Sequence, residues 1–159
     1  MTSPLSQHAN NTPSVMITSQ LFGALEIAEH QLLTMPDGLF GFPTCTRFAL
    51  LPAGREGFFW LQSAEQPTVA FLIVDPFLYF GGYTVDLTGT VLQRLDTSEP
   101  AQVNVYTIVT LPGATGEATA NLQGPLVFNV AARHGFQAVI QDSEFGTRVP
   151  IPRESLAAH

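Results

Sequence analysis

Two neighbouring stretches, Trp60-Leu61-Gln62-Ser63 and Val69-Ala70-Phe71-Leu72-Ile73-Val74-Asp75-Pro76-Phe77, decide the fold of this chain. Residues 69–74 are consecutive apolar residues over a strand length, and they predict a central strand that is covered on both faces. A third stretch, Ala120-Asn121-Leu122-Gln123-Gly124-Pro125-Leu126-Val127-Phe128-Asn129, starts another apolar strand after its proline. None of them holds the nucleophile, paired carboxylates or metal ligands that chemistry would need, so they indicate a domain that binds rather than catalyses.

Short β-type runs with turn residues between them extend in both directions from this centre. We expect strands near residues 15–18, 25–27, 32–35, 48–51, 58–61, 69–74, 103–110, 126–130, 136–140 and 148–151. The first two runs flank Phe22-Gly23 and predict a hairpin, and the runs 126–130 and 136–140 are expected to pair with each other. Pro36-Asp37-Gly38 predicts a tight turn.

One segment departs from this period. Leu87, Val91, Leu92 and Leu95 have the spacing of one helix face, and Thr88 or Asp86 is suited to cap that helix. The fold class predicted from the whole pattern is mainly β: a compact antiparallel β-barrel-like single domain with one short helix.

The predicted domain covers residues 15–151. Residues 1–14 are polar and predict a disordered tail, and residues 152–159 predict a second, C-terminal tail. No apolar run approaches the roughly 20 residues of a membrane span. The N-terminus lacks the pattern of a secretory signal, so a cytoplasmic protein is expected. Cys45 has no second cysteine with which to form an internal disulfide.

The charge argues against direct nucleic-acid binding. The net charge is −7, and all six basic residues are arginines spread along the chain. A protein that grips duplex through its backbone makes about 6–10 phosphate contacts, which would need every arginine on one face. An acidic surface is better placed to attract a basic partner, and RNA-binding proteins are common partners of this kind.

Residues that could carry chemistry are few. The four histidines lack metal-ligand spacing, and Ser63 lacks the turn of a hydrolase nucleophile, so we interpret Ser63 as a strand-end hydroxyl that bonds to backbone. We predict no catalytic, metal or cofactor-binding residue. One alternative is a β-barrel that binds a small ligand or flavin in its mouth, near the aromatic residues Phe40, Phe42 and Tyr79.

Taken together, the segments resemble the flagellar assembly factor FliW family, from about Ile17 to Ile151. The resemblance rests on the order and spacing of these pieces: Phe22-Gly23, Glu26-Ile27, Pro36-Asp37-Gly38-Leu39, Gly41-Phe42, Trp60-Leu61-Gln62-Ser63, Ala70-Phe71, Asp75-Pro76-Phe77, Tyr83, Ile108-Val109-Thr110, Asn121-Leu122, Pro125 and Gln137. The chain departs from the family pattern at Phe40, where proline is frequent, and at Gly81-Gly82, where a more polar pair is common.

The resemblance implies a non-catalytic regulator in the cytoplasm. Proteins of this family bind flagellin, for which they act as a chaperone, and they bind CsrA, a small basic RNA-binding regulator. CsrA held in this way no longer represses translation of its targets, and flagellin secretion frees the factor to return to CsrA. The free protein is expected to be a monomer. We expect the partner-binding residues to include Phe40, Phe42, Gln62, Asp75, Phe77, Tyr83, Asn121 and Gln123.

Overall fold

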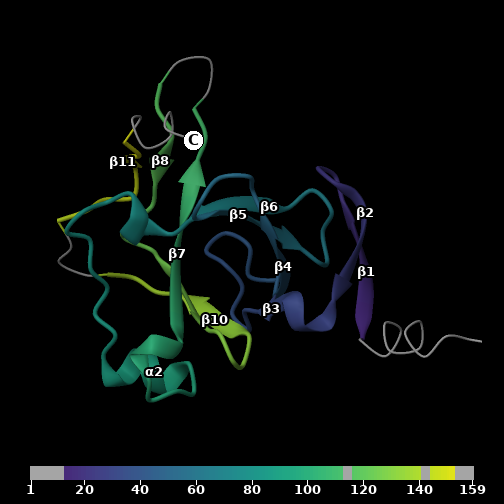
Figure 1. Ribbon diagram of the computed structural model, residues 1–159, viewed down its shortest axis with the longest axis horizontal. Coiled ribbons are helices and arrows are strands. Elements are labelled where there is room, and N and C mark those ends of the chain that lie inside the picture. The colour runs from purple at the N-terminus through teal and green to yellow at the C-terminus, as the bar shows by residue number, and fades with distance from the viewer. Residues whose placement is uncertain (1–12, 113–115, 141–143, 153–159) are drawn as a thin grey trace, which may run out of the picture.

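The computed structural model describes residues 13–112, 116–140 and 144–152 of the chain, and these residues form a β-barrel with a few added elements (Figure 1). The strands are β1 (Ser14–Ser19), β2 (Gly23–Ala28), β3 (Leu32–Thr34), β4 (Arg47–Pro52), β5 (Phe58–Ser63), β6 (Ala70–Val74), β7 (Val103–Thr110), β8 (Thr119–Ala120), β9 (Leu126–Asn129), β10 (His134–Gln137) and β11 (Val149–Pro150). The helical elements are α2 (Gly89–Arg94) and the 3₁₀ turns η1 (Glu29–Gln31), η2 (Pro76–Leu78) and η3 (Pro100–Gln102).

The barrel wall closes on itself through β7. Within the described residues the strand order is β7-β6-β5-β4-β3-β10-β9, and β9 pairs again with β7. The predicted mainly β, barrel-like fold with one short helix is therefore confirmed. One neighbour pair departs from the antiparallel pattern: β3 and β10 pair in parallel, with His134 opposite Thr34. A closed ring of seven strands cannot alternate direction all the way round, so one parallel neighbour is required.

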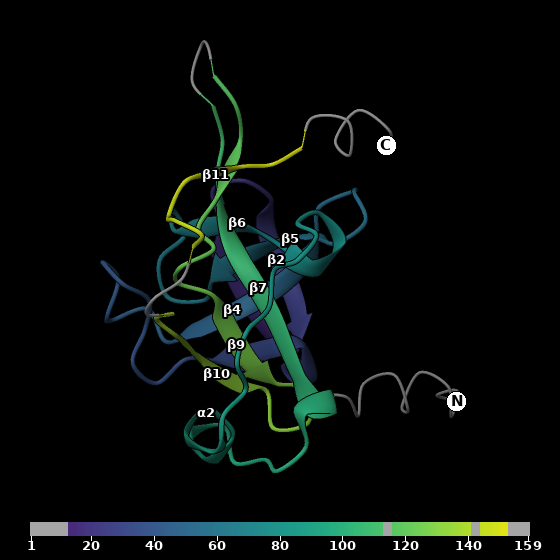
Figure 2. The ribbon, with the colours of Figure 1, turned by 90° about the vertical axis from the view of Figure 1, so that its left-hand side faces the viewer.

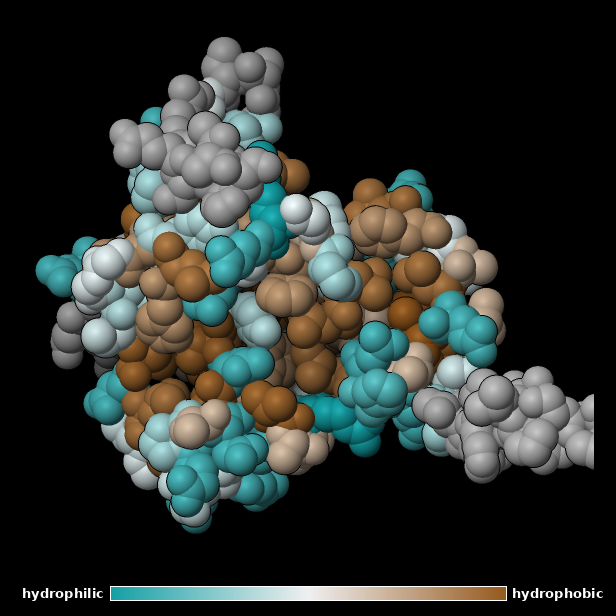
Figure 3. Space-filling model, viewed as in Figure 1, coloured by the Kyte–Doolittle hydropathy of each residue, from teal (hydrophilic) through white to brown (hydrophobic). Residues whose placement is uncertain are grey.

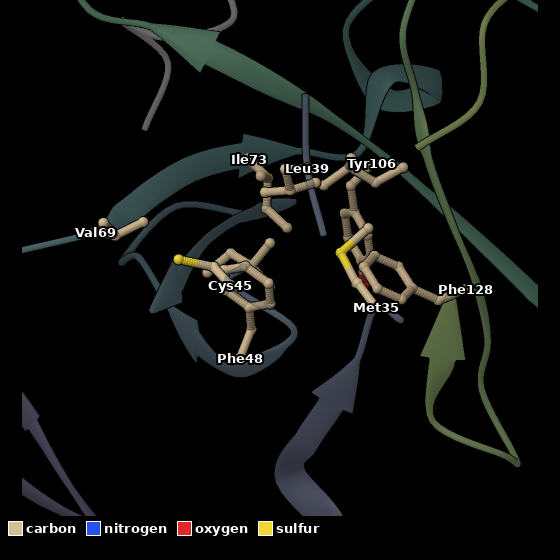
Figure 4. Close-up of a cluster of buried hydrophobic side chains, with 10 residues drawn as sticks. Met35, Leu39, Cys45, Phe48, Val69, Ile73, Tyr106 and Phe128 are labelled. Carbon is tan, nitrogen blue, oxygen red and sulfur yellow. The ribbon is translucent and has the colours of Figure 1, made fainter. Parts of the chain in front are cut away.

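The hydrophobic core lies inside this wall (Figure 4). Its buried residues are Met35, Leu39, Cys45, Phe48, Leu61, Val69, Ile73, Tyr106, Leu126 and Phe128. They come from β4, β5, β6, β7 and β9, from the loop after β3 and from the residue just before β6. This inward-facing set is what the alternation of β5 and β7 directs toward the axis.

Two added elements cover parts of the outer wall. The β1–β2 hairpin, predicted from the sequence, packs Ile17 and Ile27 over Leu32 and Ala49. Helix α2 is followed by the buried Leu95, which contacts Val105 and its neighbours on the outer side of β7 and β9. Thr88 occupies the N-cap position as predicted, but its side chain makes no capping hydrogen bond.

The third addition is a small arm, which we define as Val109–Thr110 of β7 together with β8 and β11. Two register pairs join β7 to β8, and two join β8 to β11. Figures 1 and 2 both show the arm extending beyond the barrel wall.

Strand β6 lies between β5 and β7, so it is a central strand as predicted, and its residues Ile73 and Val74 are fully buried. Residues 70–72 are only half-buried, so full coverage of both faces was wrong for this part of the strand.

The predicted tails fall largely on residues 1–12 and 153–159, which lie outside the described residues, and β1 begins at Ser14. Within the described ranges, no helix has the length and hydropathy needed to cross a membrane.

Candidate protein-binding surfaces

The loop after β3 exposes the aromatic side chain of Phe40 at the molecular surface. Gly38 has φ +67°, and a Cβ at this position would lie 2.4 Å from the carbonyl oxygen of Phe42, so the turn requires glycine. Leu39 pairs with Phe42 across the turn and is buried in the core. Phe40, at the tip, is 61% exposed, and its N–H donates to Oε1 of Gln137 at 2.9 Å. The loop is anchored on both sides while its tip remains available for contact.

Phe42 belongs to the same loop but is seated more deeply. Its ring meets the ring of Phe71 edge-on, with centroids 5.2 Å apart. Beside this loop, a groove of about 420 Å³ separates it from α2. We call this the α2 groove; it is lined by Asp37, Gly38, Phe40, Thr90, Val91, Arg94, Phe136, Gln137, Ala138 and Val139.

Arg94 lines the α2 groove, and two contacts hold its side chain in place. Its guanidinium carbon lies 3.8 Å from the ring centroid of Phe136, which is a cation–π contact, and the same side chain forms an ion pair with Asp37. Hydrophobic residues reach the molecular surface beside α2 and between the arm and the β1–β2 hairpin (Figure 3).

Asp75 and Phe77 lie where the chain leaves β6. The carboxylate of Asp75 accepts a hydrogen bond of 3.0 Å from the N–H of Phe77 and caps η2. This turn leaves Phe77 49% exposed, with its ring 5.8 Å from that of Tyr83. Asp75 thus positions the turn, and Phe77 presents apolar surface.

Gln62 and Tyr83, two residues expected to contact a partner, are buried. Oε1 of Gln62 accepts a bond from the hydroxyl of Ser19, and its Nε2 lies within hydrogen-bond distance of three backbone carbonyls. The hydroxyl of Tyr83 donates to the carbonyl of Leu122 at 2.8 Å, and burial raises the pKa of Tyr83 to about 12. Both side chains hold the fold together and offer no surface to a partner, so we remove them from the predicted contact set.

Asn121 and Gln123 lie in the loop between β8 and β9. Oδ1 of Asn121 accepts the N–H groups of Gln123 and Gly124, at 3.1 and 2.9 Å, so this side chain fixes the turn after β8. Both side chains remain partly exposed. Gln137, whose side chain also bonds Phe40, donates to the carbonyl of Gly124 at 3.0 Å, so this loop and the Phe40 loop are held by one residue.

A second groove was not foreseen from the sequence. We call it the arm groove; its volume is about 400 Å³, and it is lined by Ala53, Arg55, Phe58, Trp60, Leu72, Val109, Leu111, Pro112, Gly116, Glu117, Ala118 and Ile151. Its lining is mostly apolar and comes from β5, β6, the end of β7, the segments before β5 and β8, and the residue after β11. Leu72, from the half-buried stretch of β6, lines this groove, and the apolar run at residues 69–74 was the available signal.

Ser63, which was considered as a nucleophile, and Cys45 both have structural roles. The hydroxyl of Ser63 accepts the N–H groups of Glu65 and Gln66, which confirms its interpretation as a strand-end hydroxyl. Cys45 is fully buried in the core. Among the residues that the structure describes, no group of three or more His, Cys, Asp or Glu side chains is arranged to hold a metal ion.

Comparison with known proteins places the chain in a family. A sequence model described as FliW protein matches residues 16–151. The flagellar assembly factor FliW of Treponema denticola is 37% identical over 89% of this chain and 97% of its own length, and that of Moorella thermoacetica is 39% identical over 90% and 92%. A crystal structure of the flagellar assembly factor FliW superimposes with a TM-score of 0.79 at 32% identity, and the match covers 87% of this chain and 98% of that one. By sequence and by structure, the chain belongs to the FliW family.

Proposed function

We propose that this chain is a cytoplasmic flagellar assembly factor that binds flagellin and the RNA-binding regulator CsrA, and that it acts by exchanging these partners rather than by catalysis. The observation that carries the proposal is the family match over residues 16–151, together with relatives named flagellar assembly factor over nearly their whole length. CsrA bound to this protein would no longer repress translation, and flagellin would displace it.

The molecular surface supports a role in protein binding. Phe40 and Phe77 are large apolar side chains held outward by turns that are themselves fixed by hydrogen bonds. Exposed aromatic residues on rigid supports are typical anchors of protein interfaces, because little conformational freedom is lost when they are covered. Phe40, Phe42, Asp75, Phe77, Asn121 and Gln123 remain the proposed contact residues. The net charge of −7 favours a basic partner such as CsrA.

Calorimetric titration tests this proposal directly. The protein is titrated with CsrA from its own genome, and the titration is repeated after flagellin from that genome has been added. We expect saturable binding of CsrA that flagellin reduces. Size-exclusion chromatography of each mixture gives the stoichiometry and tests whether the free protein is monomeric. Failure of the folded protein to bind either partner would overturn the proposal.

A small ligand is the second candidate, and the arm groove is the observation that favours it. Its volume of about 400 Å³ falls within the range of ligand pockets, and Phe58 and Trp60 line it. The aromatic residues that first suggested a ligand are not brought together, since Tyr79 packs on Phe58 while Phe42 packs on Phe71. Native mass spectrometry of the purified protein, with a visible absorbance spectrum for flavin, tests this candidate. A bound species that survives desalting would support it.

A further inference from the structure

We propose that the arm groove is a docking site at which an extended segment of a basic protein partner adds to the open edge of β6. This inference rests on the proposed function, because it takes the partner to be a protein. It goes further in naming the surface, the conformation of the bound segment and the chemistry that selects it.

Strands β6 and β7 are paired over only part of their length. Their register contains Ile73 opposite Ile108 and Val74 opposite Thr107, and it stops there. Strand β6 nevertheless remains paired with β5 as far as Ala70. Strand β7 continues into the arm, where β8 pairs with its other edge, the one that pairs with β9 earlier in the strand. An opening is therefore left between the start of β6 and the arm.

The backbone N–H and C=O groups of Ala70 face this opening. The N–H of Ser63 donates to the carbonyl of Val69 at 2.9 Å, so the backbone groups of Val69 point toward β5. Successive residues of a strand direct these groups to opposite sides, so the N–H and C=O of Ala70 point away from β5. Within the described ranges, no strand pairs with Ala70 on that side. An unpaired strand edge of this kind accepts an added strand.

The apolar arm groove lies beside this edge of β6. Leu72 is two residues along β6 from Ala70, on the same face, and it lines the groove with Trp60 of β5. Leu111 also lines the groove, and it is 58% exposed although it is a large apolar side chain. A segment paired with the edge would place alternate side chains over this face, and one apolar side chain would fill the space between Trp60 and Leu111.

The charge of the whole chain favours a basic segment. Glu117 is exposed at the groove and Arg55 also lines it, so these two charges balance, and the net charge of −7 supplies the attraction. A basic side chain next to the apolar anchor would lie near Glu117, and the overall field would attract a basic protein before contact. An extended segment that combines an apolar residue with neighbouring lysine or arginine fits both features.

Trp60 gives a direct readout of occupancy. It is the only tryptophan in the chain, it lines the groove, and its ring meets that of Phe22 edge-on at 6.3 Å. Protein labelled with 5-fluorotryptophan should therefore give one ¹⁹F resonance. We expect this resonance to shift when purified CsrA, the basic probe, is added to the labelled full-length chain.

Variants then test the groove and the edge separately. Leu111→Glu places a charge on the apolar wall, and Ala70→Pro removes the unpaired N–H while leaving the β5 pairing intact. We expect each to weaken CsrA binding by at least about tenfold. The matched control is Val130→Glu, an exposed apolar residue (49%) after β9 and outside both grooves, which should leave affinity unchanged. Glu117→Arg should weaken binding at low salt, and added salt should remove that difference.

The outcomes separate this inference from the proposed function. If wild-type protein binds CsrA but the ¹⁹F resonance does not move and Leu111→Glu binds equally well, the docking site is wrong and the proposed function stands. If flagellin rather than CsrA shifts the resonance and is sensitive to Leu111→Glu, the basic occupant is wrong. If neither protein binds the wild-type chain, both proposals fail. Thermal melting of each variant establishes that it is folded, and a folded Leu111→Glu alone suffices if Ala70→Pro does not fold.

Discussion

The side-chain hydroxyl of Ser19 donates a hydrogen bond of 2.8 Å to Oε1 of Gln62, and both residues are buried. This bond joins the β1–β2 hairpin to the barrel wall. Ser19 also accepts the N–H groups of Leu21 and Phe22, so one hydroxyl fixes the hairpin turn and its seat on β5. A polar pair thus holds two largely apolar surfaces in one register.

Replacing Gln62 with leucine should lower the free energy of unfolding by about 1–3 kcal/mol, because the Ser19 hydroxyl then lacks its acceptor in a buried site. Urea denaturation followed by circular dichroism measures the change. The control is Gln123→Leu, a partly exposed glutamine, which we expect to change stability by less than about 0.5 kcal/mol. Equal losses for the two variants would show that the buried bonds of Gln62 contribute nothing particular.

Leu39 and Phe40 should separate packing from contact, although they are adjacent. Leu39→Ala removes a core side chain and should cost about 2–5 kcal/mol in unfolding free energy. Phe40→Ala removes a side chain that is mostly in solvent, so its cost should stay below about 0.5 kcal/mol while affinity for the protein partner falls. Thermal melting and calorimetry on both variants check this. A large loss of stability in Phe40→Ala would remove that residue from the proposed surface.

Gly135→Ala should destabilise the barrel by about 1–3 kcal/mol through overpacking. A Cβ at this position would lie 2.1 Å from the carbonyl oxygen of Val127 and 2.5 Å from Cδ1 of Phe128, at the pairing of β9 with β10. Gly146→Ala is the matched control, since nothing lies within 4 Å of its added methyl group. Urea midpoints of the two variants decide the matter, and similar midpoints would contradict the close approach.

Stability should fall at alkaline pH because of Tyr83. Burial raises its pKa to about 12 in the folded protein, whereas an unfolded tyrosine titrates near 10. The unfolded state therefore loses its proton first as pH rises, so this contribution is fully present below about pH 10 and is lost by about pH 12, to the order of 2 kcal/mol. The pKa values of Tyr79 and Tyr106 are also raised, mainly by burial, and act in the same direction.

Urea denaturation of wild-type protein and of Tyr83→Phe over this pH range measures the effect. The variant lacks the titrating group, so its stability should fall less steeply with pH. It should also be less stable at neutral pH, because the carbonyl of Leu122 loses its donor. Parallel pH profiles for the two proteins would show that Tyr83 does not carry the dependence.

The strands themselves were predictable because their patterns are local. Strand β7 occupies the predicted residues 103–110, since its β-branched and aromatic residues leave no ambiguity of length. Strand β10 begins at His134 instead of residue 136 because the turn lies earlier in the chain. Asn129 starts that turn by accepting the N–H of Ala132, and Arg133 ends it in a left-handed conformation with φ +59°.

Burial of polar side chains and the position of the grooves could not be predicted in this way. Gln62 shares a strand face with Trp60, and the sequence alone does not indicate that Gln62 is buried beneath the hairpin while Trp60 both contacts Phe22 of the hairpin and lines a groove. The arm groove exists because β6 pairs with β7 only at Ile73 and Val74 while β7 continues into the arm with β8 on its other edge, and this depends on partners far away in the chain. Such features are set by tertiary pairing and leave no period in the sequence.

The parallel joint between β3 and β10 has a consequence for the order of folding. Thr34 and His134 form its single register pair, and the backbone bond from the N–H of Thr34 to the carbonyl of Arg133 supports it. The two partners are separated by most of the chain, whereas β4, β5 and β6 pair with sequence neighbours. Closing so long a loop for so few bonds is entropically unfavourable until the rest of the sheet is in place. We therefore expect this joint to form last during folding and to open first when amide hydrogens exchange with solvent.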